Sequence, residues 1–255
     1  MCLIVIANEV HPQYKTILVA NRDEFYERDT QAIHFWEESP NLLAGKDLVA
    51  GGTWIGVTKE GKLAAITNYR DPKRILDDAP SRGHLTKNYL QNDWEPLKYL
   101  MRMQFRAAEY NGFNLILGDK EDLFYYSNYE RIIKKMDAGI FGLSNHLLDT
   151  PWPKVERAKQ KIKDYLLTHQ SLVISDLFAL MKDTHQPEDE ALPHTGVPLE
   201  WERILSSMFI KSPKYGTRSS TVILWDYSDH ITMADRVYDT NEDTYKDQVF
   251  ELGIK

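Results

Sequence analysis

The order of strand-like and helix-like segments is the sequence feature that most limits the fold. Apolar runs rich in β-branched residues predict strands over 3–8, 16–21, 53–58, 62–68, 113–118, 123–127, 139–144, 221–226 and 231–237. Helical spacing of apolar residues predicts helices over 84–110, 153–167 and 174–182. Because the segments come in blocks and not as βαβ units, we expect an α+β layered fold with mostly antiparallel sheets. No linker divides the chain, so we expect a single domain over residues 1–255.

Composition restricts the class of protein. The chain has 255 residues, 42% of them hydrophobic, which is ordinary for a globular protein. A net charge of -7 argues against nucleic acid as a partner. A single cysteine predicts a reducing compartment, and the apolar run 3–7 is too short for a signal peptide or a membrane span. We therefore expect a cytoplasmic enzyme or binding protein.

Turn residues join the predicted strands into hairpins. The strands 3–8 and 16–21 meet at His11-Pro12-Gln13, and two later hairpins turn at Lys59-Glu60-Gly61 and at Ser228-Asp229-His230. Gly51-Gly52 predicts a tight turn or a close approach of two backbones. The helix over 174–182 is expected to begin at a cap formed by Ser175 or the residue before it.

The only cysteine, Cys2, directly follows Met1. If Met1 is removed, Cys2 carries a thiol and a free α-amine, whose ordinary pKa values are about 8.5 and about 8. A nucleophile and a base then belong to one residue, as in enzymes with an N-terminal threonine. The alternative is a small apolar residue that packs in the core.

Four polar residues, Asn21-Arg22-Asp23-Glu24, end the second predicted strand. They form either a charged turn or part of a site. The first hairpin favours a site, because antiparallel pairing brings the end of the second strand beside Cys2. Arg22 can then lower the pKa of the thiol, and Asp23 can accept a hydrogen bond from the α-amine.

Three later polar residues follow or begin strands. Asn68 and Asn145 are each either a turn residue or a side-chain donor to an oxyanion, and Asn145 has a further alternative as a cap of the turn toward Pro151. Arg218 is either a clamp for an anionic group or a solvated loop cation.

His185 and His194 flank three acidic residues and raise the question of a metal site. Their spacing fits no ligand pattern, and the polar stretch 183–198 is better explained as a surface loop. We therefore expect neither a metal nor a cofactor.

The short motifs taken together resemble the NRDE family, which is the transport and Golgi organisation protein 2 group. They extend from residue 1 to about residue 221 and comprise Met1-Cys2, Asn21-Arg22-Asp23-Glu24, Ala50-Gly51-Gly52-Thr53-Trp54-Ile55-Gly56, Thr67-Asn68-Tyr69-Arg70, Ser81-Arg82-Gly83, Gly142-Leu143-Ser144-Asn145 and Gly216-Thr217-Arg218-Ser219-Ser220-Thr221. The resemblance therefore covers nearly the whole chain.

That family is similar to the N-terminal nucleophile hydrolases, and this implies a four-layer αββα sandwich. By analogy with cysteine-type choloylglycine hydrolases and penicillin V acylases, the catalytic residues would be Cys2, Arg22, Asp23, Asn68, Asn145 and Arg218. Those acylases have the order Arg-Asn-x-Asp where this chain reads Asn-Arg-Asp-Glu. Within the same motifs we expect contacts to substrate from Asn21, Glu24, Trp54, Arg70 and Arg82.

Two functions follow as hypotheses. The first is an amidohydrolase that cleaves a non-peptide C–N bond of a small acyl amide through a Cys2 thioester after removal of Met1. In this reaction Asn68 stabilises the oxyanion and Asp23 orients the amine. The second is a non-catalytic binding protein or chaperone of the same fold for haem or a lipid or acyl ligand, since related proteins are linked to secretory and Golgi organisation.

Overall fold

The computed structural model describes residues 2–239 and 244–254, and their contacts divide the chain into two compact units. The first unit contains residues 1–27, 138–144 and 148–251, and the second contains residues 28–137, 145–147 and 252–255. Met1, whose removal the hydrolase hypothesis requires, lies outside the described residues. Each unit has one antiparallel sheet with helices packed on it, as expected for an α+β protein.

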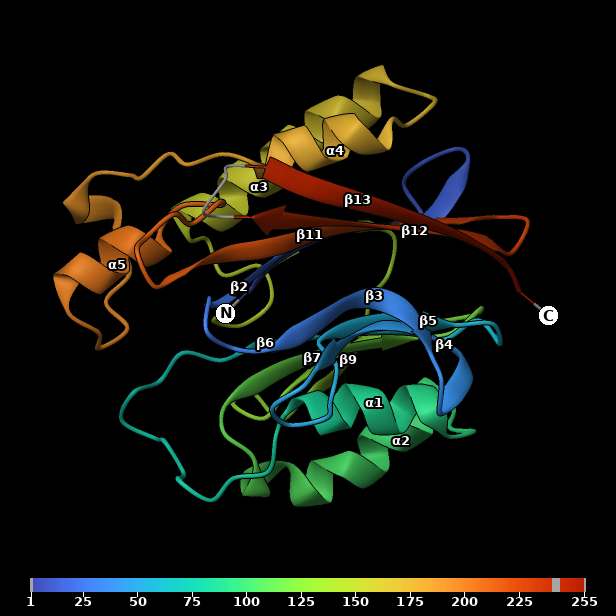
Figure 1. Cartoon of the computed structure of the whole chain (residues 1–255), viewed down its shortest axis with the longest axis horizontal. Coiled ribbons are helices and arrows are strands. Elements are labelled where there is room, and N and C mark those ends of the chain that lie inside the picture. The colour runs from blue at the N-terminus through green and yellow to red at the C-terminus, as the bar shows by residue number, and fades with distance from the viewer. Residues whose placement is uncertain (1, 240–243, 255) are drawn as a thin grey trace. The chain divides into compact units, whose positions relative to one another are not determined.

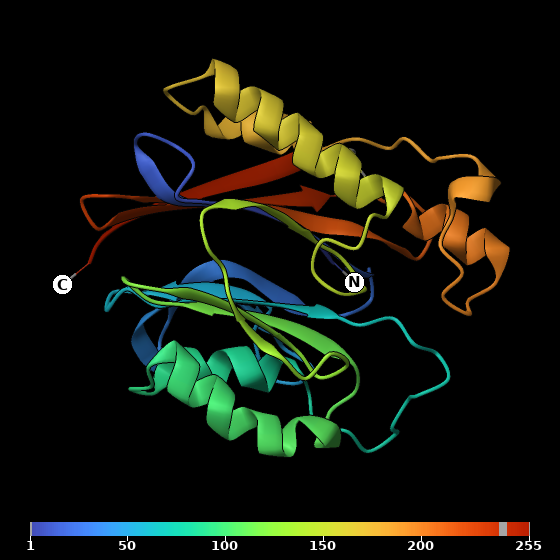
Figure 2. The ribbon, with the colours of Figure 1, turned by 180° about the vertical axis from the view of Figure 1, so that it is seen from behind.

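The sheet of the first unit has six strands in the order β10-β1-β2-β11-β12-β13. Figures 1 and 2 show helices lying along this sheet, and apolar side chains of α3 and α4 form one core with residues of β1, β2 and β11. The elements are β1 (Cys2–Asn8), β2 (Tyr14–Phe25), β10 (Gly139–Leu143), α3 (Pro153–Thr168), α4 (Ile174–Met181), α5 (Leu199–Leu205), β11 (Tyr215–Asp226), β12 (His230–Asp239) and β13 (Thr244–Gly253), with a 3₁₀ turn at Asp189–Ala191.

The sheet of the second unit has seven strands in sequence order from β3 to β9. Side chains of α1 and α2 pack on it in a second core. The elements are β3 (Thr30–Trp36), β4 (Ser39–Asp47), β5 (Ile55–Thr58), β6 (Leu63–Asn68), α1 (Gly83–Gln91), α2 (Pro96–Met103), a 3₁₀ helix (Gln104–Glu109), β7 (Phe113–Gly118), β8 (Leu123–Ser127) and β9 (Ile133–Lys135).

All three predicted hairpins are present. β1 pairs with β2, β5 with β6 and β11 with β12, each antiparallel. Gly61 and Asp229, in the two later turns, have left-handed backbones with φ of 79° and 58°. These turns explain why the strands reverse where the sequence predicted.

Gly51 forms the expected tight turn, and Gly52 makes the expected close approach of two backbones. Gly51 has a left-handed backbone with φ of 68°. A Cβ on Gly52 would lie 2.6 Å from the backbone carbon of Gly83, which is closer than atoms approach. The Thr53 N–H donates to the Gly83 carbonyl at 3.2 Å, so these glycines allow the start of α1 to pack directly on the chain before β5.

Two expectations about helices were wrong. The segment 84–110 is not one helix, because the chain leaves α1 at Asn92 and α2 begins at Pro96, which forces Glu95 into an extended conformation. The capping prediction for α4 also fails: Val173 occupies the N-cap and makes no side-chain capping bond.

Candidate active site

Cys2 is held in the middle of the first sheet, at the start of β1. It lies directly opposite Arg22 of β2, so the two side chains are on the same face of the sheet. On the other side of β1, the Ser144 hydroxyl donates to the Cys2 carbonyl at 3.0 Å. The cysteine is buried, with 9% of its surface exposed. Pairing on both sides therefore gives the only thiol of the chain a fixed position.

Burial determines the state of this thiol. It raises the pKa of Cys2 above the ordinary value, and the nearby Asp23 carboxylate acts in the same direction. The charge of Arg22 and a hydrogen bond from the Asp23 backbone N–H to the sulfur lower the pKa, but they do not outweigh burial. Arg22 thus acts as expected, yet the thiol is protonated at neutral pH and needs a base before it can attack a carbonyl.

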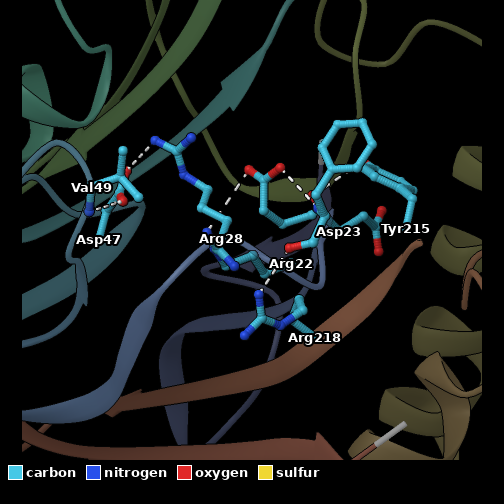
Figure 3. A network of polar contacts seen from close by, with 9 residues as sticks. Arg22, Asp23, Arg28, Asp47, Val49, Tyr215 and Arg218 are labelled. Atoms are coloured by element: carbon cyan, nitrogen blue, oxygen red, sulfur yellow. Dashed lines mark hydrogen bonds and ion pairs between the residues drawn. The ribbon is translucent and has the colours of Figure 1, made fainter.

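Asp23 points to the opposite face from Arg22, because successive side chains of a strand alternate. Its carboxylate accepts a hydrogen bond from the Thr217 hydroxyl at 2.7 Å, and its backbone carbonyl accepts one from the Tyr215 hydroxyl at 3.1 Å. Figure 3 shows Asp23 beside Tyr215. Only 1% of Asp23 is exposed, and burial raises the pKa of its carboxyl group.

Lys154 is a member of this site that the sequence analysis missed. This lysine of α3 is 4% exposed, and its Nζ donates to the Leu205 carbonyl at 2.8 Å. Its charge is the largest influence that lowers the pKa of Asp23 against the effect of burial. The sequence signal was weak, because Lys154 follows Pro153 at the start of a helix where a solvated lysine is usual.

Asn21 shares the face of Asp23, but its amide is already engaged. Its Nδ2 donates to the carbonyls of Met181 and Met208 at 3.0 and 2.8 Å, and its Oδ1 accepts from the Ser220 hydroxyl at 2.6 Å. The side chain is fully buried. This geometry ties β2 to β11 and to the chain around α4, and the contact of Asn21 with substrate stays a prediction.

Arg218 lies at an irregularity of the strand next to β2. Thr217 is opposite Asp23 and Ser219 is opposite Arg22, so Arg218 is an extra residue in β11. Such a β-bulge redirects a side chain and is common beside active sites. The guanidinium group of Arg218 donates to the Phe25 carbonyl at 2.9 Å. Figure 3 shows the Arg218 side chain near Arg22.

Glu24 is on the same face as Arg22. One carboxylate oxygen lies 3.9 Å from Nη2 of Arg22, and the other accepts the Phe25 N–H at 2.9 Å. About a quarter of the Glu24 side chain is exposed. Its substrate contact stays a prediction, while its pairing places a counter-charge beside Arg22.

Asn68 and Asn145 both belong to the second unit, where they contact each other. The Asn145 Nδ2 donates to the Asn68 carbonyl at 2.9 Å, and the Asn145 carbonyl accepts the Arg70 N–H at 2.8 Å. Asn145 is fully buried, whereas Asn68 is half-buried. Among the residues described, none makes a hydrogen bond to the Asn68 side-chain amide, so this amide can donate to a ligand.

Trp54 and Arg82, the remaining residues expected at the substrate, also lie in the second unit. The Trp54 ring fills the space above Gly45, where an added Cβ would come within 2.3 Å of it. The Arg82 guanidinium donates to the Gly112 carbonyl at 3.0 Å. Both residues therefore have a packing role, and their contact with substrate stays a prediction.

The polar loop raised as a metal site has other contacts. Asp189 forms an ion pair with Arg203, and Asp183 accepts the His185 N–H at 2.9 Å. These interactions agree with the interpretation of the segment as a surface loop.

The structure thus brings together Cys2, Arg22, Asp23 and Arg218 on neighbouring strands of the first unit. It brings together Asn68, Asn145 and Arg70 in the second unit. The substrate contact of Arg70 and the catalytic roles of the other six residues, including an oxyanion hole formed by Asn68, stay predictions.

The chain is an α+β protein with two antiparallel sheets and packed helices, and Cys2 begins an inner strand of the first sheet. Two solved structures of conjugated bile acid hydrolase from Clostridium perfringens resemble this chain with TM-scores of 0.51 and 0.50 at 8% identity. They cover 100% and 98% of this chain, and the match spans 98% and 96% of their own chains. At this identity the likeness shows the fold, and it confirms the fold class expected from the sequence.

The chain belongs to the Transport and Golgi organisation 2 family, whose model matches residues 1–240. A homologue from Bos taurus named Transport and Golgi organization protein 2 homolog is 39% identical over 92% of both chains. The homologue of the same name from Homo sapiens is 34% identical over 100% of both chains. The family resemblance inferred from the motifs is therefore confirmed.

Proposed function

We propose that this chain is an N-terminal cysteine amidohydrolase that cleaves a linear, non-peptide acyl amide after removal of Met1. The observation that carries the proposal is the register of β1 and β2, which puts Cys2 opposite Arg22 and beside the Asp23 backbone N–H. A thiol whose pKa is raised by burial is not a nucleophile by itself, so the mechanism needs a base next to the sulfur. The α-amine of a processed Cys2 is such a base.

The reaction has two halves. The Cys2 α-amine takes the thiol proton, the sulfur attacks the amide carbonyl, and the Asn68 amide donates to the oxyanion. The C–N bond then breaks as the leaving amine receives the proton, and a Cys2 thioester remains. Water, activated by the same amine, attacks the thioester and releases the carboxylic acid with the thiol restored. Buried Asp23, held by Thr217, orients the amine.

The experiment compares turnover of a panel of acyl amides by the wild type, Cys2→Ser and Cys2→Ala. The proposal expects release of carboxylic acid and amine by the wild type alone, and a trapped thioester visible by mass spectrometry. Thr168→Ala, a change in an exposed residue at the end of α3, serves as a control that keeps full turnover. Turnover at the wild-type rate by both Cys2 variants would show that the cysteine is not the nucleophile.

A second candidate is the binding protein for a lipid or acyl ligand, and one cavity favours it. A cavity of about 440 Å³ in the first unit is lined by Thr217, Phe209, Ile210 and two tyrosines, with Lys182 and Lys211 also in its wall. Its described lining includes tyrosine but no histidine, methionine or cysteine, so it suits an acyl chain better than haem. The test is a titration of haem and of a fatty acid into the wild type and into Cys2→Ala. Tight binding of either ligand, together with no turnover of acyl amides by the wild type, favours this candidate.

We also propose that the protein acts in the cytoplasm, which is supported by its single cysteine. Among the described residues, no helix combines the length and the apolar character needed to cross a membrane.

A further inference from the structure

A second cavity, of about 320 Å³, lies within the second unit beside the segment that follows Asn68. Its size is at the lower end of the range of about 300–1,000 Å³ that is usual for small-molecule sites. It lies between the segment after β6 and the turn after β8, and its lining residues are Lys73, Arg74, Ile75, Leu76, Ala108, Tyr110, Gly112, Asn128, Tyr129 and Arg131.

All the charged residues that line this cavity are basic. Lys73, Arg74 and Arg131 line it, and no carboxylate is among the described lining residues. Two exposed cations elsewhere in the same unit form ion pairs, Lys98 with Glu95 and Arg106 with Glu109. None of the three cavity cations forms an ion pair within residues 2–239 and 244–254. In a chain of net charge -7, three such cations around one cavity favour an anionic ligand.

Hydrogen bonds hold the segment that carries two of these cations. The Tyr129 hydroxyl donates to one oxygen of Asp71 at 2.8 Å, and the other oxygen accepts the Lys73 N–H at 3.0 Å. The Arg74 guanidinium lies over the Tyr129 ring, 5.0 Å from its centre. These contacts therefore hold the backbone at Lys73 and place the Arg74 guanidinium beside the Tyr129 ring.

Apolar side chains are held exposed at the same place. Ile75 is 66% and Leu76 is 48% exposed. The Leu76 N–H donates to the Asn111 side chain at 2.8 Å and the Leu76 carbonyl accepts from it at 3.0 Å. An exposed apolar pair that hydrogen bonds keep beside three cations suits a ligand with both an anionic and an apolar part.

Arg131 has a left-handed backbone, with φ of 59°. This conformation is unfavourable for a residue with a Cβ, and glycine or asparagine is usual there. The Arg131 N–H donates to the Ser127 carbonyl at 2.8 Å, which holds the turn. The Arg131 Nε donates to the Asn128 carbonyl at 3.5 Å, which places the guanidinium group at the wall of the cavity.

The cavity is connected to the predicted oxyanion residue within the same unit. Tyr69, which follows Asn68, stacks on Tyr129 with ring centres 3.7 Å apart. The Gly112 carbonyl accepts the Tyr69 N–H at 2.8 Å, and Gly112 itself lines the cavity. A ligand in the cavity would thus contact the chain that positions Asn68.

We propose that this cavity binds an oxyanion, a carboxylate or a phosphate ester, attached to an apolar group. Arg74 and Arg131 bind the oxyanion, and Ile75, Leu76 and the Tyr129 ring contact the apolar part. This ligand site lies wholly within the second unit and goes beyond the proposed function. The binding itself does not depend on catalysis.

Calorimetric titration tests the site with three probes: phenyl phosphate, phenylacetate and neutral benzyl alcohol. We expect at least one anion to bind more than about tenfold more tightly than benzyl alcohol. Tighter binding of phenyl phosphate assigns the site to phosphate esters, and tighter binding of phenylacetate assigns it to carboxylates. Equal binding of all three probes, or no binding of either anion, overturns the proposal.

Variants separate charge from folding. Arg74→Gln and Arg131→Gln should each weaken anion binding about tenfold, whereas Lys98→Gln, an exposed cation elsewhere in the unit, should leave it unchanged. Arg131→Gly relieves the strained backbone, so it should keep or raise the melting temperature and still lose affinity. Unchanged anion affinity in all three arginine variants contradicts the site.

Cys2→Ala distinguishes this proposal from the proposed function. It should bind the preferred anion as tightly as the wild type and have no turnover. If the wild type also lacks turnover while anion binding is lost in the arginine variants, the cavity site stands and the amidohydrolase proposal falls. If turnover depends on Cys2 but no anion binds, the amidohydrolase stands and the cavity site falls.

Discussion

The Thr217 hydroxyl donates to the Asp23 carboxylate at 2.7 Å, from β11 to β2. Thr217 Oγ1 also accepts the Ile210 N–H at 2.9 Å, so one hydroxyl connects the loop before β11 to the buried acid. The bond compensates in part for the loss of solvent around a carboxyl group that is 1% exposed. The Thr217–Asp23 hydrogen bond therefore helps to hold the end of β2, which lies opposite Cys2.

Thr217→Val should remove both hydrogen bonds while keeping the shape of the side chain. We expect a loss of about 1–3 kcal/mol in the free energy of unfolding, because a buried acceptor loses its donor. Thr217→Ser keeps the hydroxyl and should lose clearly less. Urea unfolding measures the free energy of unfolding of both variants. Equal losses would show that side-chain packing, and not the hydrogen bond, accounts for the stability.

Lys154→Met should raise the pKa of Asp23 further, since the largest charge that opposes burial is removed. The acidic limb of the rate profile for kcat/KM should then move to higher pH, because Asp23 ionises later. Stability should fall by about 1–3 kcal/mol as the Leu205 carbonyl loses its donor. Lys163→Met, an exposed lysine of the same helix, is the control. A profile that does not move would deny Lys154 its influence on Asp23.

Asn68→Ala should mainly reduce turnover, whereas Asn145→Ala should mainly reduce stability. The Asn68 variant should reduce turnover about 10²–10³-fold, as expected for loss of an oxyanion donor, with stability changed by less than about 0.5 kcal/mol. The Asn145 variant should lose stability by about 1–3 kcal/mol, because the fully buried Asn145 amide no longer donates to the Asn68 carbonyl. Full turnover by the Asn68 variant would exclude it from the oxyanion hole.

The Cys2 thiol should make stability depend on pH. Its pKa is raised by burial in the folded state, so it titrates above the value of about 8.5 of the unfolded chain. A raised pKa means that its contribution to stability is complete below about pH 8.5 and is lost as the pH rises through the folded pKa. The difference in unfolding free energy between wild type and Cys2→Ala should therefore shrink above that pH. Parallel curves would show that the thiol pKa is ordinary.

Local chemistry explains which parts of the fold were predictable. The strands 113–118 and 123–127 were predicted with their exact bounds, because apolar and β-branched runs ended at turn residues. β13 was missed because it is an edge strand whose residues are mostly exposed, so it lacks the apolar alternation that identifies a strand. The break between α1 and α2 depends on a single proline, Pro96, which the apolar period alone does not reveal.

The sequence predicted the neighbours of Cys2 only where the pairing register of two adjacent strands fixes their positions. Pairing of the first two strands was enough to bring Arg22 and Asp23 to Cys2. Lys154 was missed because its burial depends on how α3 packs on the sheet. The sequence also showed no sign that the Asn21 amide bonds to carbonyls of Met181 and Met208, 160 and 187 residues away in the chain. Contacts at such separation leave no local signal.

The most direct test of the central claim uses one chain in two forms. The protein is prepared with a cleavable tag ahead of Cys2, and turnover of the acyl amide panel is measured before and after a protease exposes Cys2 as the first residue. The mechanism predicts that turnover appears only after cleavage, together with a thioester on Cys2, because the α-amine is the base. Equal turnover in both forms would contradict it.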